Sequence, residues 1–477
     1  MLAFTFAVIL LIAGYFVYGK FAERVFGVDQ QRSTPSIANP DGVDYVPLPW
    51  WKAFLIQFLN IAGLGPIFGA IMGIMYGPSA YLWIVLGTIF GGAVHDYMSG
   101  MMSVRANGAN QPELVGRELG NGIKVFMNFF SIGLMVLVGA VFISGPAELL
   151  NNMSNGFMGV TSWIVLIFTY YILATLLPID KIIGKIYPFF GVALLFMAVG
   201  IMVAMYVNNA NVVMTHDFYN HHPSKLPIFP MMFISIACGA VSGFHATQSP
   251  LMARCIVNEK LGRRVFYGAM VAEGIVALIW AAAASSFFGS IEGLQEFVAR
   301  LAPTANKPAV VVDHIAKTWL GQFGGILALL GVVAAPLSTG DTALRAARLM
   351  SAEFLKLNQK SIKNRLIISI PIFVITFILL QVNFDVIWRY FAWWNQTLSV
   401  FTLWAITVYL AKRKRFYGIS LIPALFMTSV TITYILMAKE GFGLPQLTSY
   451  IIGFSATLFS IILFYTKKSK FKNYLSD

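Results

Sequence analysis

Acidic and imidazole side chains occur inside long apolar stretches of this chain, where charge is costly. His95 and Asp96 share one stretch with Ser99 and Ser103, whose spacings from Asp96 place all three on one helix face. Glu273 lies in a second stretch among Ala, Val, Leu and Ile. A carboxylate inside a bilayer costs about 3 kcal/mol or more unless it is paired, which makes it a functional candidate. We predict that His95, Asp96 and Glu273 couple ions or protons; the alternative is structural, an Asp96–His95 pair and a neutral buried Glu273.

Hydroxyl groups and one carboxylate gather at the end of a third apolar stretch. Ser338, Thr339 and Thr342 flank Asp341 within five residues. Oxygen ligands of this kind suit a small hard cation. The pattern predicts a cation site formed by the three hydroxyls, with Asp341 taking part in ion coupling. The alternative is an ion pair between Asp341 and Arg345 at a spacing of four.

Two long apolar segments are interrupted at their middle by glycine, proline and small polar residues, at 58–66 and 238–250. Lipid cannot satisfy the backbone groups that a broken helix exposes, so such breaks persist only inside protein or beside a watery cavity. Two breaks in one chain predict a substrate or ion site near the bilayer midplane, and half-helix N-termini suit an anionic group. The predicted substrate-binding residues are Asn60, Gly63, Gly65, Gly239, Ser242, Gly243, His245 and Gln248. The alternative is helix packing through small residues, with His245 as a hydrogen-bonded bundle residue.

Composition places these segments in a membrane. The chain has 477 residues, of which 58% are hydrophobic and only 11% charged, against roughly 25% charged in soluble domains. We expect one all-α integral membrane domain, with an apolar N-terminus retained as a span rather than cleaved. Cys238 and Cys255 are predicted to be free thiols. Nucleotide-binding and metalloprotease motifs are absent from the sequence, so we expect neither ATP hydrolysis nor a cofactor.

About thirteen stretches are long enough to span a bilayer, which takes about 20 apolar residues each. They are 2–18, 51–77, 79–104, 122–146, 159–178, 183–206, 228–250, 265–287, 321–343, 366–382, 385–410, 418–436 and 447–466. Lys and Arg follow the odd-numbered stretches, which predicts an outside N-terminus and a cytoplasmic C-terminus. The net charge of +13 therefore indicates topology rather than binding to nucleic acid.

The two broken stretches are the second and the seventh, five apart. An odd number of spans per repeat gives the two repeats opposite orientation, as in the LeuT-like 5+5 inverted repeat. The predicted divisions are 1–50 for a peripheral helix and cytoplasmic loop, 51–206 for repeat one, 228–410 for repeat two and 411–477 for peripheral helices. Loops at 207–227 and 288–320 are expected to cap the outer entrance.

The motifs around these residues resemble those of the carbon starvation protein A (CstA) family. The resemblance is carried by Ile61–Pro66, Gly92–Tyr97, Ile234–His245 and Thr339–Thr342 with Arg345. It implies a bacterial or archaeal inner-membrane protein that imports short peptides during carbon starvation, or pyruvate together with protons. The family is grouped with the amino acid–polyamine–cation transporters. In LeuT-type folds the third helix of the second repeat supplies hydroxyls to a sodium site, and the resemblance places Ser338, Thr339 and Thr342 there.

The sequence therefore predicts an ion-coupled symporter for a short peptide or pyruvate, coupled to protons or sodium. Its expected partners are the small-molecule substrate and the lipid bilayer, and it is not expected to be an enzyme. An intramembrane enzyme using His95–Asp96 or His245 is one alternative, although no nucleophile or metal set is spaced for it. A channel or a nutrient sensor is the other, although the soluble output domain usual in sensors is missing from this sequence.

Overall fold

The computed structural model of this chain describes residues 1–42, 44–154, 156–176, 179–212, 218–302, 306–359 and 361–469. These residues form helices and connecting segments, with a single isolated parallel bridge between Leu48 and Ile256 among them. The described part of the chain is therefore all-α, as the sequence predicts.

The helices before and within the first predicted repeat differ widely in length. They are α1 (Leu2–Phe16), α2 (Tyr18–Phe26), α3 (Pro35–Ala38), α4 (Trp50–Ile61), η1 (Gly65–Gly69), α5 (Ala70–Ile74), α6 (Ser79–Leu86), η2 (Gly87–Gly92), α7 (Ala93–Arg105), α8 (Gln111–Leu119), α9 (Asn121–Met153), α10 (Gly159–Leu176) and α11 (Ile179–Val207).

The helices from the second break onward complete the bundle. They are η3 (Ile228–Met232), α12 (Phe233–Ser235), α13 (Phe244–Ala253), η4 (Glu259–Leu261), η5 (Arg263–Tyr267), α14 (Gly268–Phe287), α15 (Ile291–Ala299), α16 (Lys307–Ala328), η6 (Leu329–Val333), α17 (Ala334–Phe354), α18 (Ile362–Leu379), α19 (Phe384–Lys412), α20 (Gly418–Met437) and α21 (Gln446–Lys468).

Several of these helices are long and apolar enough to cross a membrane. Among the described residues, seven helices meet this criterion by length and composition. The number is eight if the bent pair Trp50–Ile61 and Gly65–Ile74 counts as one span. The protein is therefore a multi-span membrane protein. Each of the thirteen predicted stretches corresponds to a helix or a run of adjoining helices, but the number that cross the bilayer stays a prediction.

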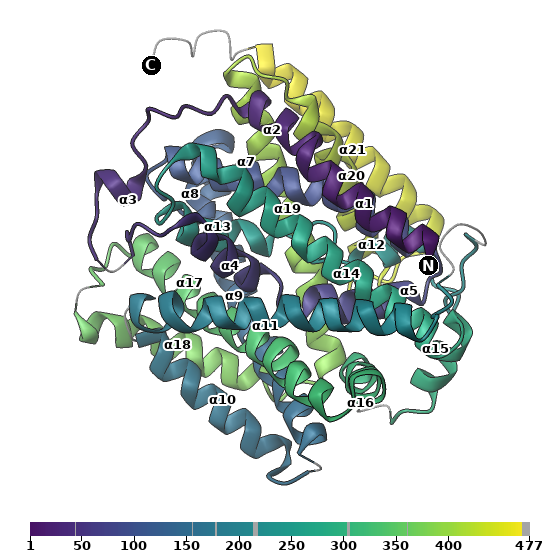
Figure 1. The fold of residues 1–477 in the computed structure, drawn as a ribbon. Helices are drawn as coiled ribbons and strands as arrows, with labels where there is room; N and C mark the ends of the chain where they lie inside the picture. The colour runs from purple at the N-terminus through teal and green to yellow at the C-terminus, as the bar shows by residue number, and fades with distance from the viewer. Residues whose placement is uncertain are drawn as a thin grey trace.

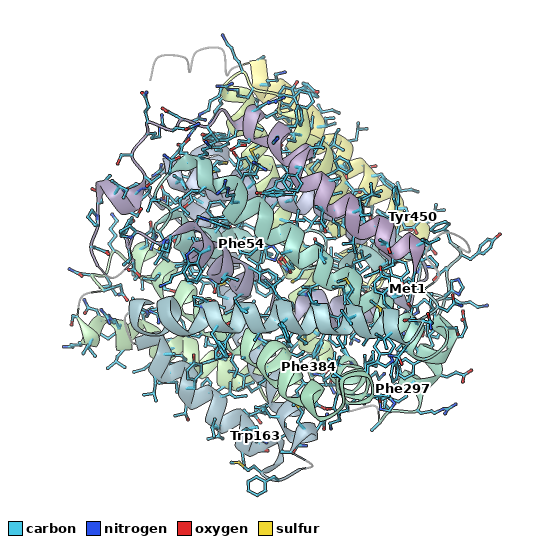
Figure 2. The ribbon with its side chains drawn as sticks, viewed as in Figure 1. Met1, Phe54, Trp163, Phe297, Phe384 and Tyr450 are labelled. Atoms are coloured by element: carbon cyan, nitrogen blue, oxygen red, sulfur yellow. The ribbon has the colours of Figure 1, made fainter. Side chains whose placement is uncertain are left out.

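The long helices surround a small set of central ones. Figure 1 shows α1 and α21 along one edge and α10 along the opposite edge, with α4, α13 and α14 between them. Figure 2 places Tyr450 of α21 and Trp163 of α10 far apart in the view. The most apolar window of Glu259–Phe287 is 83% buried and that of Gln446–Lys468 only 17%. Hence α14 is a core helix and α21 faces outward.

Both predicted helix breaks are present. The first follows Ile61: Ala62 has a non-helical ψ of 51°, and the axis bends by 54° before the chain continues through η1 and α5. The second follows Ser235, because Ile236 has a ψ of 60° and α13 begins only at Phe244. Glycine at both breaks, with Pro66 at the first, explains why the sequence reveals them.

The expectation of a long loop at 288–320 is wrong. That region contains α15 and the first part of α16, which turns sharply at Gly321 with a φ of 61°. The start of α15 carries an ordinary capping signal, since the Ser290 hydroxyl accepts a hydrogen bond from the Gly293 N–H at 3.1 Å. Of the predicted loop 207–227, residues 213–217 lie outside the described residues.

Candidate functional site

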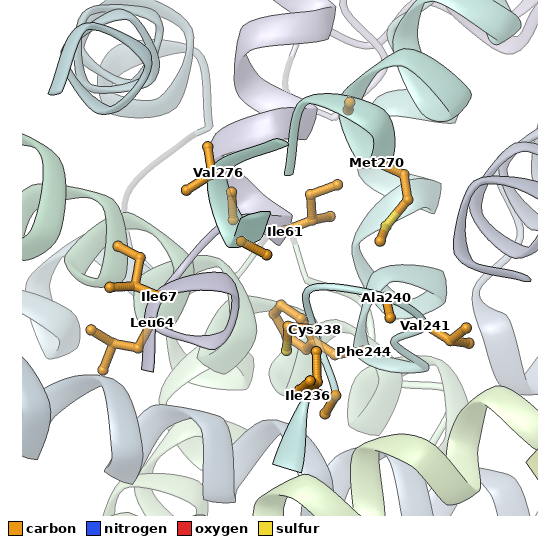
Figure 3. Packing of buried hydrophobic residues seen from close by; sticks show 14 of the residues in the cluster. Ile61, Leu64, Ile67, Ile236, Cys238, Ala240, Val241, Phe244, Met270 and Val276 are labelled. Atoms are coloured by element: carbon orange, nitrogen blue, oxygen red, sulfur yellow. The ribbon is translucent and has the colours of Figure 1, made fainter. Parts of the chain in front are cut away.

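The two helix breaks pack directly against each other. A Cβ atom added to Gly65 would lie 2.2 Å from the Cβ of Cys238, and one added to Gly69 would lie 2.8 Å from the carbonyl oxygen of Ser235. The close-up in Figure 3 shows Leu64 and Cys238 in the same packed region between the two breaks. Glycine at Gly65 is therefore required for the two backbones to approach this closely.

The other predicted glycines are equally confined. An added Cβ would lie 2.9 Å from Phe142 at Gly63, 2.6 Å from Ala277 at Gly239 and 2.3 Å from the Ser399 backbone nitrogen at Gly243. All eight predicted substrate-binding residues are buried. The structure thus shows the region between the breaks in a closed arrangement.

Four buried ionisable side chains contact one another in series. His95 Nδ1 lies 2.8 Å from Asp96 Oδ1, and His245 Nδ1 lies 2.8 Å from Asp96 Oδ2. His245 Nε2 lies 3.4 Å from Glu273 Oε2. All four side chains are fully buried. We call His95, Asp96, His245 and Glu273 the buried ionisable chain.

Both ends of the buried ionisable chain keep polar atoms without hydrogen bonds in the described structure. These atoms are His95 Nε2 and the two carboxylate oxygens of Glu273, and His245 Nε2, which faces Glu273, also lacks a hydrogen bond. A buried polar group without a hydrogen bond costs about 1–3 kcal/mol, so native proteins keep few of them. No group of three or more His, Cys, Asp or Glu among the described residues is arranged to hold a metal ion. Each member of the buried ionisable chain thus lies within 3.4 Å of the next, a distance that suits the passing of protons.

Asn395 of α19 stabilises the second break. Its Oδ1 accepts hydrogen bonds from the Phe244 N–H at 2.6 Å and the Ser242 hydroxyl at 3.2 Å. The Thr88 hydroxyl donates to the Gly239 carbonyl at 3.1 Å. Ser242 therefore contacts Asn395 rather than an open space. The sequence gives Asn395 little weight, because one amide in an apolar helix has no spacing signal.

Asn60 and Gln248 have different surroundings although both were predicted to bind substrate. Neither the nitrogen nor the oxygen of the buried Asn60 amide has a hydrogen-bond partner in the described structure. Gln248 Nε2 donates to the Thr247 hydroxyl at 3.0 Å and lies 3.6 Å from Met135 Sδ of α9. Asn60 thus offers a free donor and a free acceptor at the first break, whereas Gln248 is directed toward α9.

Only one hydroxyl of the predicted sodium site reaches the first break. Thr339 Oγ1 lies 3.0 Å from the Leu59 carbonyl oxygen. The hydroxyls of Ser338 and Thr342 donate to carbonyls of their own helix, to Ala335 at 2.6 Å and to Ser338 at 3.1 Å. The hydroxyl set is therefore satisfied by backbone carbonyls.

Asp341 lies on another side of α17. Its Oδ2 accepts a hydrogen bond from the Tyr187 hydroxyl at 2.5 Å, and Arg345 donates to the Ala174 carbonyl at 2.6 Å. Asp341 is thus held by α11, apart from the Thr339 hydroxyl that contacts α4. The sequence could not show this, because it depends on how α17 is rotated in the bundle.

Comparison with known proteins identifies the family. The profile described as Carbon starvation protein CstA matches residues 1–166 and 149–319. The chain belongs to the CstA family. It is 43% identical over 349 residues to an uncharacterized membrane protein of Haemophilus influenzae, an alignment that covers 62% of this chain and 94% of that one.

Two named transporters are more distant relatives. The pyruvate/proton symporter BtsT of Escherichia coli is 28% identical over 344 residues, covering 58% of this chain and 48% of BtsT. A peptide transporter CstA of Helicobacter pylori is 27% identical over 332 residues, covering 56% and 48%. The CstA-family chain thus spans about half the length of these transporters.

The fold matches that of a solved transporter. A manganese transporter of Eremococcus coleocola superposes with a TM-score of 0.52 at 12% identity, covering 91% of this chain and 99% of that one. At this identity the match shows the fold alone, which is LeuT-like. The predicted all-α, LeuT-like fold is therefore confirmed, whereas the thirteen spans and the two repeats stay predictions.

Proposed function

We propose that this CstA-family protein is a proton-coupled symporter that imports a small carboxylate-bearing nutrient, either pyruvate or a short peptide. The observation that carries the proposal is the buried ionisable chain, in which His245, one residue inside the helix after the second break, joins Asp96 to Glu273. The names of the relatives, a pyruvate/proton symporter and a peptide transporter, agree with this substrate class.

The proposal includes the arrangement in the membrane. About thirteen helical stretches cross the bilayer, and 51–206 and 228–410 form the two inverted repeats. The protein lies in a bacterial or archaeal inner membrane, with its N-terminus outside and its C-terminus in the cytoplasm. The LeuT-like fold supports the repeats, and the placement of Lys and Arg supports the orientation.

The proton moves along the buried ionisable chain. Glu273, whose carboxylate lacks hydrogen bonds, accepts the proton and so loses a charge that the interior disfavours. His245 Nε2 takes the proton across the 3.4 Å gap, and His245 Nδ1 passes one to Asp96 at 2.8 Å. Asp96 then holds the proton on Oδ2, and His95, 2.8 Å from Oδ1, can take it after the carboxyl group has rotated. Histidine suits the bridging position because both ring nitrogens carry or release protons near neutral pH.

The substrate carboxylate binds at the breaks. The helix after the second break starts at Phe244, so its first N–H groups point toward an acceptor at Gly239–Gly243. At the first break, Asn60 supplies a donor and an acceptor that have no partner in the described structure. Pyruvate and peptides share a carboxylate, and these groups recognise that carboxylate.

A sodium ion held by Ser338, Thr339 and Thr342 is the alternative coupling ion. Thr339 Oγ1 and the Leu59 carbonyl, which would both be ligands, are already 3.0 Å apart. Two oxygen ligands at 2.3–2.6 Å from a cation would stand farther apart than this on most coordination geometries. For a proton, the same structure offers the two 2.8 Å contacts of Asp96 with the histidines and one 3.4 Å gap between His245 and Glu273, and for this reason we favour it.

The substrate decides which force drives uptake. One proton entering with a pyruvate anion moves no net charge, so only the pH gradient drives it. One proton entering with a zwitterionic dipeptide moves one positive charge, which gains about 2.3 kcal/mol per 100 mV and sustains roughly fiftyfold accumulation. Membrane potential without a pH gradient therefore separates the two substrates.

The test is uptake of labelled pyruvate and of a labelled dipeptide into proteoliposomes. One series carries only a pH gradient and a second only a potassium–valinomycin potential, inside negative. Accumulation of a labelled compound above its outside concentration supports a symporter and identifies the substrate. The potential alone should drive uptake of the dipeptide but not of pyruvate. Equilibration without accumulation would indicate a channel, and a converted product would indicate an enzyme.

A variant tests the role of the bridging histidine. His245→Gln removes the exchangeable proton but keeps a polar side chain, so the pH dependence of uptake should flatten. The matched control is Gln248→Met in the same helix. It introduces no charge, and the new side chain lies beside Met135. An unchanged pH profile in His245→Gln would return His245 to a structural role.

A further inference from the structure

One end of the bundle carries three segments that meet outside the proposed transport site. They are α2, the turn 413–417 and the end of α21. The rings of Phe21 and Phe416 lie 6.0 Å apart, and a Cβ at Gly27 would lie 2.6 Å from the Arg415 guanidinium. Lys468 Nζ donates to the Tyr417 hydroxyl at 2.7 Å. We call this surface the basic corner.

The basic corner has exposed cations without carboxylate partners. Five of its exposed basic side chains form no salt bridge within the described residues: Lys20, Arg24, Lys414, Arg415 and Lys467. A sixth, Arg413, lies 3.9 Å from Glu118.

Nearby acidic groups are already engaged. Glu23 pairs with Arg263 at 3.0 Å, and Glu118 pairs with Lys412 at 2.9 Å. Asp29, just beyond Gly27, accepts a hydrogen bond from the Gln31 N–H. Positive charge at the basic corner is therefore only partly offset by the protein itself, and it fits an anionic partner.

Apolar surface continues directly from this charge. Phe21 is 39% exposed and Phe416 is 58% exposed, both beside the basic side chains. Val17, between α1 and α2, is 72% exposed, and Ile462 of α21 is 52% exposed. Because α1 and α21 are membrane-span candidates with little burial, this apolar surface faces lipid tails. A partner must therefore present negative charge and hydrocarbon together.

We propose that the basic corner binds anionic phospholipid headgroups, with Phe21 and Phe416 packed among the upper parts of the acyl chains. The basic side chains contact the headgroup phosphates, and aromatic side chains at this depth anchor the helices at the boundary between headgroups and tails. Such a lipid bridges α2 to the turn before α20 and to α21. This site is independent of the transported substrate and of the proton path.

The test uses the whole 477-residue chain purified in neutral detergent. It is titrated with phosphatidylglycerol or phosphatidylcholine at low and high salt, and bound lipid is counted by native mass spectrometry. Phosphatidylglycerol should bind more tightly, and the difference should shrink in high salt. Equal binding of the two lipids would overturn the proposal.

Variants locate the lipid on the surface. Lys414→Gln with Arg415→Gln should weaken phosphatidylglycerol binding about thirtyfold, since each basic residue near an anionic lipid contributes about fivefold. Arg300→Gln with Lys439→Gln removes the same charge from exposed positions elsewhere and should change nothing. Equal effects from the two pairs would refute the location. Unchanged melting temperatures in lipid-free detergent show that the variants fold.

A third arm distinguishes lipid from a free anion. Phe416→Ser should weaken binding of phosphatidylglycerol but leave competition by inorganic phosphate unchanged and weak. If millimolar inorganic phosphate displaced the lipid completely, the basic corner would be a site for free anions, and the lipid proposal would fail.

Discussion

Glu273→Gln is the sharpest perturbation of the proposed proton path. Glutamine has nearly the shape of a protonated glutamic acid, but it cannot release a proton. Glu273 is fully buried and neither of its carboxylate oxygens has a hydrogen bond in the described structure. The substitution therefore removes no hydrogen bond, and we expect the free energy of unfolding to change by less than about 1 kcal/mol.

The magnitude follows from the stoichiometry. With one proton per pyruvate, a gradient of one pH unit is worth about 1.4 kcal/mol and sustains about tenfold accumulation. In Glu273→Gln that ratio should fall to about one, because binding no longer requires or releases a proton. Exchange of internal for external substrate should continue, because it needs the alternation of the breaks but no net proton movement.

The assay is pyruvate or dipeptide uptake into proteoliposomes, with net accumulation and exchange measured on the same preparation. Glu292→Gln is the matched control, because Glu292 is an exposed residue of α15 that contacts His221. Tenfold accumulation retained by Glu273→Gln would refute the reasoning. Loss of exchange together with accumulation would assign Glu273 to substrate binding or to the fold instead.

Three further predictions follow from other contacts. Replacing sodium with choline should leave proton-driven accumulation unchanged; sodium-dependent uptake that disappears in Thr339→Ala with Thr342→Ala would instead assign coupling to the hydroxyl set. Gly65→Ala should abolish uptake, since its Cβ would lie 2.2 Å from that of Cys238. Adding Cys238→Gly to the same chain should restore part of the uptake. If uptake is not restored, this contact does not explain the defect of Gly65→Ala. Glu259→Gln should lower the thermal melting point in detergent, because breaking a buried ion pair costs about 3 kcal/mol or more and Glu259 is fully buried against Arg105 at 2.9 Å; an unchanged melting point would contradict this.

The sequence predicts the helices and their breaks well because both depend on local properties. Apolar length defines a span, and glycine or proline inside one interrupts it, as at Gly65 and around Gly239. Helix α15 and the first part of α16 were missed because their mixed charges resemble a solvated loop. Their amphipathic pattern and the Ser290 cap were the available signals.

The buried ionisable chain could be predicted only in part. Asp96 and Glu273 stand out from the sequence because each is a carboxylate in an apolar stretch. His245 was assigned to substrate binding, and the structure places it between those carboxylates. The three residues come from different helices, so no sequence spacing reports their distance. Asn395, in a fourth helix, was given little weight for the same reason.

The position of His245 offers a physical link between the substrate and the proton. His245 follows Phe244, the first residue of α13, so any rearrangement of the second break moves the imidazole at once. In the closed arrangement Asn395 Oδ1 holds the Phe244 N–H at 2.6 Å, and the Glu273 contact of His245, at 3.4 Å, is longer than its 2.8 Å contact with Asp96.

A substrate carboxylate offers the Phe244 N–H a charged acceptor, which forms a stronger hydrogen bond than the neutral amide of Asn395. Taking that N–H from Asn395 would shift the start of α13 and with it the longer of the two His245 contacts. Substrate binding would thus change the distance that the proton must cross. Under this proposal coupling needs no separate sensor, because one turn of helix would bind the nutrient and carry the bridging histidine.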